Sequence, residues 1–419
     1  MTRFSPNTAL LLISALAGVL SAAGCSREAT EAADPGTELA RSALLIDTHI
    51  DVPYRLHEDW VDVSKATAGG DFDYPRAAAG GLDLAFMSIY IPAEVDAAGE
   101  ANAFAEGLID TVEALAADAP DKLGLATCTA DVLALKAAGK LGMALGMENG
   151  GPIEGSLPNV AYFADRGIRY ITLAHSKSNH ISDSSYDENE QWQGLSEFGK
   201  TLVAEMNRQG IMVDVSHVSD KAFWQVLELS STPVIASHSS LRHFTPGFER
   251  NMSDDMVTAL GENGGVIQIN FGSSFLTKAA RDYGTASREA IERFRRDEHA
   301  AADPSALEAF MTQYRAENPY PFATVDDVLD HIDRAVALAG IDHVGIGSDY
   351  DGVGATLPIG LEDVSRYPNL VNGLLGRGYS QSDVEKILGG NLMRVWSVVE
   401  QYSAAAGHPA RCAQPRPAA

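Results

Sequence analysis

Two side chains that could bind one metal ion stand one residue apart in the stretch LLIDTHIDVP, residues 44–53. In an extended chain, positions i and i+2 point to the same side. A strand through this stretch would therefore project His49 and Asp51 together, which suits two ligands on one metal ion. A buried strand that ends in polar loop residues would give the same pattern, so this stretch alone does not decide between the two interpretations.

Residues able to do acid, base or metal chemistry also follow most of the other apolar runs of the chain. A lone histidine at the end of a strand is usually a satisfied polar group, but here six of eight runs lead into His, Asp or Glu. The C-terminal ends of parallel barrel strands meet at one rim, where active sites are found. We therefore predict one active site that contains, besides the first pair, Glu148, His175, His217, His238 and Asp349.

The apolar runs and the segments between them predict the architecture. Most runs are continuous rather than alternating, which is typical of parallel strands covered on both faces. Amphipathic segments separate them, so we predict an α/β fold, a (β/α)8 barrel of the TIM type. A doubly wound open sheet is the alternative, but no G-x-G-x-x-G follows the first run. The runs cover residues 44–48, 84–91, 142–147, 169–174, 211–216, 233–237, 265–271 and 343–348.

One connection is much longer than the others. Residues 272–323 follow the seventh run and are rich in Ala, Arg and Glu, which predicts a helical insertion after strand 7. A segment that leaves the C-terminal end of a barrel strand emerges on the active-site face. We expect a lid or rim there, with a dimerisation arm or a solvated decoration as the alternative.

The types of the predicted ligands narrow the chemistry. Imidazole and carboxylate without thiolate suit zinc, manganese or iron. Three histidines and two carboxylates exceed the needs of one open four-coordinate zinc, and suit two metals that share a carboxylate. Such a pair of ions lowers the pKa of bound water towards about 7 and so provides a nucleophile at neutral pH.

The composition excludes some partners. The formal net charge of −26 argues against nucleic-acid binding and against docking on anionic lipid through protein charge. The balance of 45% hydrophobic and 21% charged residues is that of a globular protein with a large core.

The first residues predict export. Residues 1–24 have a basic start at Arg3, an apolar run too short to span a bilayer and small residues before Cys25, which is typical of a signal peptide. We expect a periplasmic protein, or a lipoprotein anchored in the membrane through Cys25, with ordinary cleavage near Ala23 as the alternative. The organisation predicted downstream is a tether over 25–42, a catalytic domain over 43–405 and a C-terminal tail over 406–419. Whether Cys128 and Cys412 form a disulfide stays open.

Further motifs give the chain a specific resemblance. It resembles the membrane dipeptidase family, also called renal dipeptidase, within the metal-dependent amidohydrolase superfamily. The resemblance spans residues 43 to about 400 and implies a (β/α)8 barrel with two zinc ions per chain, while the residues before Cys25 resemble a bacterial lipoprotein cleavage site and so predict a bacterial, exported enzyme. It also implies a homodimer and hydrolysis of dipeptides, with a D-residue accepted on the C-terminal side. The matching pieces are IDTHIDVP, MENG, ITLAHS, VDVSHVS, SHSS, ERNMSDD, GIGSDYDG, LEDVSRYPNL and GGNLMRVW.

The resemblance also implies roles for the metal-binding residues. His49 and Asp51 would bind one zinc ion. His217 and His238 would bind the other, and Glu148 and a hydroxide would bridge the two.

Three further residues match positions that act on the substrate. Asp349 matches the acid/base that moves a proton from the bridging water to the leaving amine, with Asp351 as its nearest competitor. His175 matches the residue that polarises the scissile carbonyl or stabilises the oxyanion. Arg250 matches the residue that binds the substrate carboxylate, a bidentate task that suits guanidinium.

Two alternatives to a dipeptidase stay open. One is an amidohydrolase acting on a non-peptide amide, lactam or lactone. The other is a non-catalytic metal-binding barrel, although the intact set of ligands argues against a degenerate site.

Overall fold

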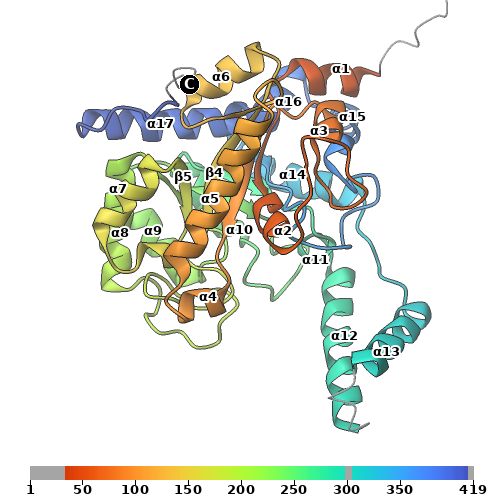
Figure 1. The fold of residues 1–419 in the computed structure, drawn as a ribbon. Helices are drawn as coiled ribbons and strands as arrows, with labels where there is room; N and C mark the ends of the chain where they lie inside the picture. The colour runs from red at the N-terminus through yellow and green to blue at the C-terminus, as the bar shows by residue number, and fades with distance from the viewer. Residues whose placement is uncertain (1–33, 298–303, 414–419) are drawn as a thin grey trace, which may run out of the picture. The chain divides into compact units, whose positions relative to one another are not determined.

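The computed structural model describes residues 34–297 and 304–413 (Figure 1). The predicted signal peptide, Cys25 and the first part of the predicted tether lie outside these ranges. Within the described ranges, no helix is both long and apolar enough to cross a bilayer.

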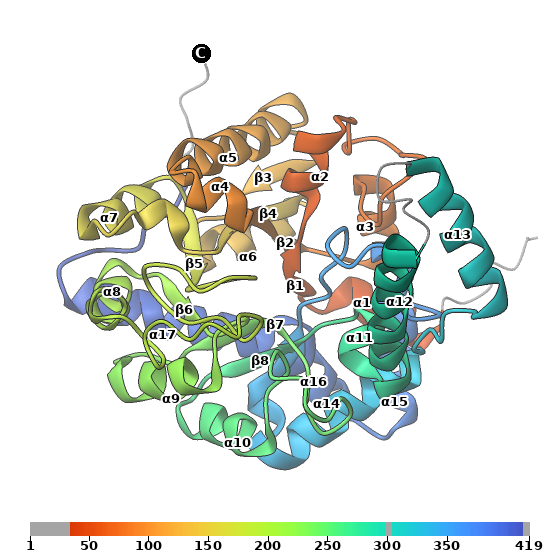
Figure 2. The same ribbon diagram turned by 90° about the horizontal axis from the view of Figure 1, so that it is seen from below.

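Parallel strands form a barrel in the described part of the chain, as predicted. The sheet order is β1-β2-β4-β5-β6-β7-β8-β9, and β3 (Leu123–Leu125) pairs with β4 outside this path. The first and last strands of this order are connected by a backbone hydrogen bond between the segments that follow β1 and β9. In this bond Asp51 N donates to Tyr350 O at 2.9 Å. Figure 2 shows the strands inside a ring of helices. The barrel strands are β1 Ile46–Ile50, β2 Leu84–Tyr90, β4 Leu141–Glu148, β5 Ile168–Thr172, β6 Met212–Asp214, β7 Ile235–Ser239, β8 Val266–Ile269 and β9 Val344–Ile346.

The helices between the strands begin and end where local signals place them. Ser219 caps α9 by accepting a hydrogen bond from Ala222 N, and Gly210 ends α8 in the left-handed conformation at φ 76°. The helices are α1 Pro35–Ser42, α2 Val52–Glu58, α3 Tyr74–Gly80, α4 Ala93–Ala97, α5 Ala101–Asp118, α6 Thr129–Ala137, α7 Leu157–Asp165, α8 Glu197–Gln209, α9 Asp220–Leu229, α10 Asp254–Glu262, α11 Ser273–Leu276, α12 Lys278–Asp297, α13 Pro304–Glu317, α14 Val325–Ala339, α15 Tyr367–Gly376, α16 Gln381–Glu385 and α17 Asn391–Ala405.

The interior of the barrel is packed, and its N-terminal end is closed by α17. Trp396 of α17 is fully buried, and its ring lies 5.4 Å from that of Phe86 on β2. The ring of Phe86 lies 5.4 Å from that of Tyr170 on β5. Because side chains fill this end of the barrel, a site for small molecules can form only at the opposite, C-terminal end.

The predicted tether over residues 25–42 is wrong for the part that the structure describes. Residues 35–42 form α1, which buries Leu39 and Ala40. The amide of Gly36 donates to Asn372 Oδ1 of α15 at 3.0 Å, which ties this helix to the barrel domain. The signal was present in the sequence, because Asp34 is an N-cap and Pro35 occupies the first helical turn.

The predicted C-terminal tail is attached to the barrel domain as far as the structure describes it. Cys412 forms a disulfide with Cys128, with 4.8 Å between the Cα atoms. Arg411 Nε donates to Asp165 Oδ1 at 2.6 Å, and Ala413 N donates to Asp131 Oδ2 at 2.8 Å. The barrel domain therefore extends beyond the predicted range of 43–405 at both ends.

The predicted helical insertion after strand 7 is present as α11, α12 and α13. The last two helices extend away from the barrel, below it in Figure 1. They pack on each other through aromatic side chains, with the rings of Phe294 and Phe310 stacked at 4.5 Å. Only α11, which precedes them, reaches the pocket described below.

Candidate active site

Every strand of the barrel path contributes a polar side chain to its C-terminal rim. Seven of the predicted site residues lie there together. The two strands without a predicted residue supply other groups, the phenol of Tyr90 from β2 and the amide of Asn270 from β8. The rim residues in strand order are His49 with Asp51, Tyr90, Glu148, His175, His217, His238, Asn270 and Asp349.

Glu148 lies at the centre of this rim, and its two carboxylate oxygens face different partners. Oε2 lies 3.3 Å from His49 Nε2, which is itself 3.4 Å from Asp51 Oδ2. Oε1 lies 3.1 Å from His217 Nε2 and 3.2 Å from His238 Nε2. One carboxylate therefore joins two pairs of metal-ligand side chains.

The hydrogen bonds of His49 fix which of its ring nitrogens carries a proton. Its Nδ1 lies 2.8 Å from Tyr170 Oη, which donates its own proton to Thr48 O at 3.0 Å. The hydroxyl can therefore only accept from His49, so Nδ1 is the protonated nitrogen. Nε2 is left as a buried lone pair without a hydrogen-bond partner among the described residues, and it faces two carboxylates. That arrangement is repulsive unless a proton or a metal cation lies between them.

The same reasoning applies to the second pair. His238 Nδ1 lies 2.8 Å from Ser237 Oγ, which donates to Asp214 Oδ2 at 2.6 Å, so Nδ1 of His238 is the donor. Its Nε2 lone pair then lies 2.8 Å from Nε2 of His217 and close to Glu148. Two imidazole nitrogens and a carboxylate oxygen thus converge at one point, which fits a cation site of nitrogen and oxygen donors.

The electrostatics of the rim also favour metal ligation. Burial, with a contribution from Arg250, holds the pKa of both His217 and His238 well below the usual value, so both rings are neutral and able to bind a metal ion. Burial disfavours the charged form of Glu148, but His49 and the other imidazoles outweigh it and hold its pKa well below the usual range. The carboxylate therefore stays ionised near neutral pH.

The pKa of His49 is shifted in the opposite direction. Burial disfavours its charged form, but Tyr170, Glu148 and the other acidic groups around the ring raise its pKa well above the usual value. A field that attracts a proton to this position attracts a metal cation for the same reason.

Asp349 is buried at the rim with one carboxylate oxygen bonded and the other directed towards the site. Its Oδ2 accepts a hydrogen bond from Asn270 Nδ2 at 2.7 Å, which leaves Oδ1 facing the rim. Burial, reinforced by the charge of Asp51, raises its pKa well above the ordinary value. Its backbone has a φ of 65°, an uncommon conformation outside glycine that is retained at functional sites.

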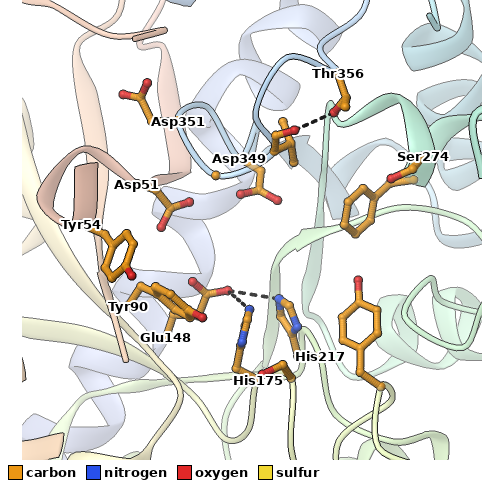
Figure 3. Close-up of a pocket in the computed structure, with 15 residues that line it drawn as sticks. Asp51, Tyr54, Tyr90, Glu148, His175, His217, Ser274, Asp349, Asp351 and Thr356 are labelled. Carbon is orange, nitrogen blue, oxygen red and sulfur yellow. Dashed lines mark hydrogen bonds and ion pairs between the residues drawn. The ribbon is translucent and has the colours of Figure 1, made fainter. Parts of the chain in front are cut away.

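Asp351, the nearest competitor of Asp349, lies on the outer side of the rim and is directed elsewhere (Figure 3). Its Oδ1 accepts from Arg55 Nη1 at 3.1 Å and from Asp71 N at 2.7 Å. Burial, partly offset by Arg55, raises its pKa to about 7. Its contacts are those of a structural ion pair at the edge of the pocket.

A pocket of about 610 Å³ opens directly over these residues. Figure 3 shows the carboxylates of Asp51, Glu148 and Asp349 pointing toward one another, with His175 and His217 beside Glu148. His175 Nε2 lies 3.6 Å from Glu148 Oε1, and its side chain is 19% exposed, so it can meet a substrate. The other lining residues include Tyr54, Tyr90, Tyr186, Ser274, Phe275 and Thr356.

Arg250 is buried beside the site and, like His49 and His238, does not line the pocket. Its two terminal nitrogens donate to Ser239 Oγ and to His238 O, both at 2.7 Å. Its Nε is buried without a hydrogen-bond partner among the described residues, and the guanidinium lies 5.4 Å from the ring of Phe275. No described carboxylate therefore neutralises the charge of Arg250. Its role in binding the carboxylate of a substrate stays a prediction.

Sequence reasoning missed the residues that hold the rim in place. Asn270 ends a strand just as the predicted residues do, so extending the strand-end rule to amides would have found it. Asp214 and Asp47 are buried acids inside apolar strands, a rare placement that signals a specific partner. Asp47 accepts from His49 N at 3.0 Å and from Tyr367 Oη at 2.6 Å. Tyr170 gave no comparable signal.

Comparisons with known proteins agree with this site. The family model described as Membrane dipeptidase (Peptidase family M19) matches residues 35–409. An uncharacterized dipeptidase of Schizosaccharomyces pombe is 31% identical over 385 residues, which cover 87% of this chain and 82% of that protein.

Two solved structures are similar over most of their length. The probable dipeptidase PvdM from Pseudomonas aeruginosa has a TM-score of 0.74 and 28% identity, covering 88% of this chain and 98% of that one. A metallo peptidase from Rhodobacter sphaeroides, liganded with a phosphinate mimic of the dipeptide L-Ala-D-Ala, has a TM-score of 0.69 and 25% identity, covering 85% and 99%. With a rim of metal-ligand side chains at the end of its barrel, this chain belongs to the membrane dipeptidase family of metal-dependent peptidases.

Proposed function

We propose that this chain is an exported dipeptidase that uses two zinc ions, and that its substrates include dipeptides with a C-terminal D-residue. The observation that carries the two-ion proposal is the position of Glu148, whose two oxygens face two separate pairs of ligand side chains. Acceptance of a D-residue is supported by the Rhodobacter sphaeroides relative, whose ligand mimics L-Ala-D-Ala.

The ligand set divides between the two ions as the resemblance implied. His49 and Asp51 would hold one ion, His217 and His238 would hold the other, and Glu148 would contact both. Nitrogen and oxygen donors without thiolate suit zinc. When bound, the two ions would acidify a shared water molecule to a hydroxide nucleophile and polarise the scissile carbonyl.

The protein side chains would move the proton and stabilise charge. Asp349 Oδ1, left free by the bond between Asn270 and Oδ2, would accept the proton of the attacking water. It would then pass this proton to the nitrogen of the leaving amine, so one carboxyl serves as base and then as acid. His175, exposed to the pocket, would donate from its ring to the oxygen on which negative charge develops.

Arg250 would bind the carboxylate of the substrate through a local rearrangement of its bonds to Ser239 and His238. Arg250→Ala should therefore lower kcat/KM for dipeptides with a free C-terminus, by about 10²-fold for a charged bond of this kind. The control substrates are the same dipeptides with a C-terminal amide. An equal loss on the amidated peptides would refute the carboxylate assignment.

Export to an oxidising compartment is part of the proposal. The disulfide between Cys128 and Cys412 supports it, because such bonds form and persist outside the reducing cytoplasm. Mass analysis of the mature protein would test it. Loss of residues 1–24 with a lipid on Cys25 would establish the anchored form, and an intact N-terminus in the cytoplasm would refute export. We also propose a homodimer, from the family resemblance, and light scattering of the purified protein would measure its mass.

The experiment that tests the function combines elemental analysis with turnover of a panel of L–L, L–D and D–L dipeptides. We expect about two zinc ions per chain and hydrolysis that a chelator abolishes and zinc restores. Two bound metals without hydrolysis of any dipeptide would refute the substrate class and favour a non-peptide amide, lactam or lactone. A chain that binds no metal would refute the proposed site itself.

A further inference from the structure

Two guanidinium groups lie on one side of the pocket without a carboxylate partner among the described residues. The first is Arg250, whose terminal nitrogens contact only a hydroxyl and a carbonyl oxygen. The second is Arg281, on the first turns of α12, whose guanidinium lies 3.8 Å from the centre of the Phe248 ring. In a chain with 57 acidic and 31 basic residues, carboxylates are plentiful, yet none is placed against either group.

Aromatic side chains connect Arg281 to the pocket. The ring of Phe248 lies 5.7 Å from that of Phe275 and 5.9 Å from that of Tyr186. Both of these residues line the pocket, and Phe248 packs behind them, so Arg281 borders the aromatic wall of the pocket through Phe248. Burial raises the pKa of Tyr186, whereas the charges of Arg250 and Arg281 act to lower it, which places both cations within electrostatic reach of this wall.

The other charged side chains that line the pocket are carboxylates, beside two imidazoles and several neutral residues. The carboxylates of Asp51, Glu148, Asp349 and Asp351 all line it from the other side. The only other guanidinium close to them, among the described residues, is that of Arg55, which is paired with Asp351. The wall formed by Tyr186 and Phe275 is therefore where an anionic part of a ligand would find uncompensated positive charge.

A half-buried arginine on an aromatic face keeps its charge partly desolvated. Burial lowers the pKa of Arg281, so its charged form lacks compensation in the free protein. A carboxylate arriving beside it would supply that compensation, and the guanidinium can remain stacked on Phe248 while its N–H groups donate sideways.

We propose that Arg281 is a specificity residue that favours dipeptides with an acidic side chain on the C-terminal residue. The inference rests on the proposed dipeptidase function. It assigns Arg250 to the main-chain carboxylate and Arg281 to the second carboxylate of an Asp or Glu side chain. It also gives the insertion a role at the rim, because α12 supplies the charge while α11 supplies Ser274 and Phe275.

The test compares acidic substrates with their uncharged isosteres. The measured quantity is the ratio of kcat/KM for Ala-Glu to that for Ala-Gln, and for Ala-Asp to that for Ala-Asn, with L- and D-forms of the second residue. For the zinc-loaded enzyme we expect a preference for the acid of about fivefold, the factor that corresponds to an ion pair at the upper end of the range for partly exposed pairs. Raising the salt concentration should reduce this preference because the pair is only partly buried.

The variants are Arg281→Gln and, as a matched control on the same helix, Arg288→Gln. Arg281→Gln should bring the ratio close to one, mainly through KM of the acidic peptides, while Arg288→Gln keeps the ratio of the original enzyme. Equal rates on acid and amide in the original enzyme, or a preference that survives Arg281→Gln, would overturn the inference. Lack of turnover on every dipeptide would overturn the proposed function together with the inference, so the two failures are distinguishable.

Discussion

The hydroxyl of Tyr170 sets the state of His49, and its removal tests the argument for the metal site. The ring lies inside the barrel and is fully buried. Room for it comes from Gly146 on β4, where an added Cβ would lie 1.9 Å from the Tyr170 ring. The substitution Tyr170→Phe therefore removes one oxygen and leaves the packing of the ring intact.

The magnitude follows from the two bonds of that oxygen. Without it, the buried Nδ1–H of His49 loses its acceptor and Thr48 O loses a donor. An orphaned buried polar group costs about 1–3 kcal/mol. His49 can then rotate or take the other tautomer, which presents an N–H instead of a lone pair to the metal. Loss of the hydrogen bond behind a metal-ligand histidine weakens metal binding by about 10–100-fold, which corresponds to about 1.4–2.7 kcal/mol.

The assay is a competition for zinc between the protein and a chromogenic chelator, read at several chelator concentrations. Tyr170→Phe should lose one of two zinc ions at a 10–100-fold lower chelator concentration, and the second ion should be affected less. Tyr379→Phe, which removes a hydroxyl bonded to Asp333 at 2.7 Å on α14, is the control and should bind zinc normally. Unchanged affinity for both ions in Tyr170→Phe would refute the tautomer argument and the assignment of His49 as a ligand.

Three further predictions concern catalysis and stability. Asp349→Asn should keep its metal content and fold but lose about 10²–10⁴ in kcat, measured with a dipeptide substrate; normal turnover would remove its role as proton carrier. Gly352→Ala should lower kcat/KM by about 10², because a Cβ there lies 2.2 Å from both Asp349 Oδ1 and Asp51 Oδ2; Gly376→Ala, with open space around it, is the matched control, and full activity would show that the rim tolerates displacement. Burial lowers the pKa of His331 to about 4 from 6.5. As the pH falls, His331 is therefore protonated at a higher pH in the unfolded chain than in the folded protein. The metal-free protein should thus lose about 3 kcal/mol of stability as pH falls from 6.5 to 4; His331→Asn should remove that part of the loss in urea unfolding, and an unchanged pH dependence would refute it.

The chemistry of the rim could be predicted from the sequence because it depends on short-range order. A strand places residues i and i+2 on one side, and parallel strands deliver their ends to one rim. His49 and Asp51, and the single residues that end the other strands, could therefore be assigned before any contact was known. Asn270 was missed because the prediction considered only side chains that ionise, although Asn270 also directly follows a barrel strand.

Other features depend on which distant segments meet, and periodicity carries no such information. The bond between His49 and Tyr170 joins residues 121 positions apart, and the disulfide joins Cys128 to Cys412 across 284 positions. Helix α1 was mistaken for part of a tether because its burial comes from α15, more than 300 residues away in the chain.

By itself, the sequence determined the barrel, the family and the identity of most residues on its rim, since alternation along strands and residue type are local properties. The tertiary structure decided which imidazole nitrogens are lone pairs, which carboxylate oxygens face which ligands, and which arginines lack a partner. These are properties of the relative placement of segments, set by packing in the closed barrel, and they determine how the same residues act on a substrate.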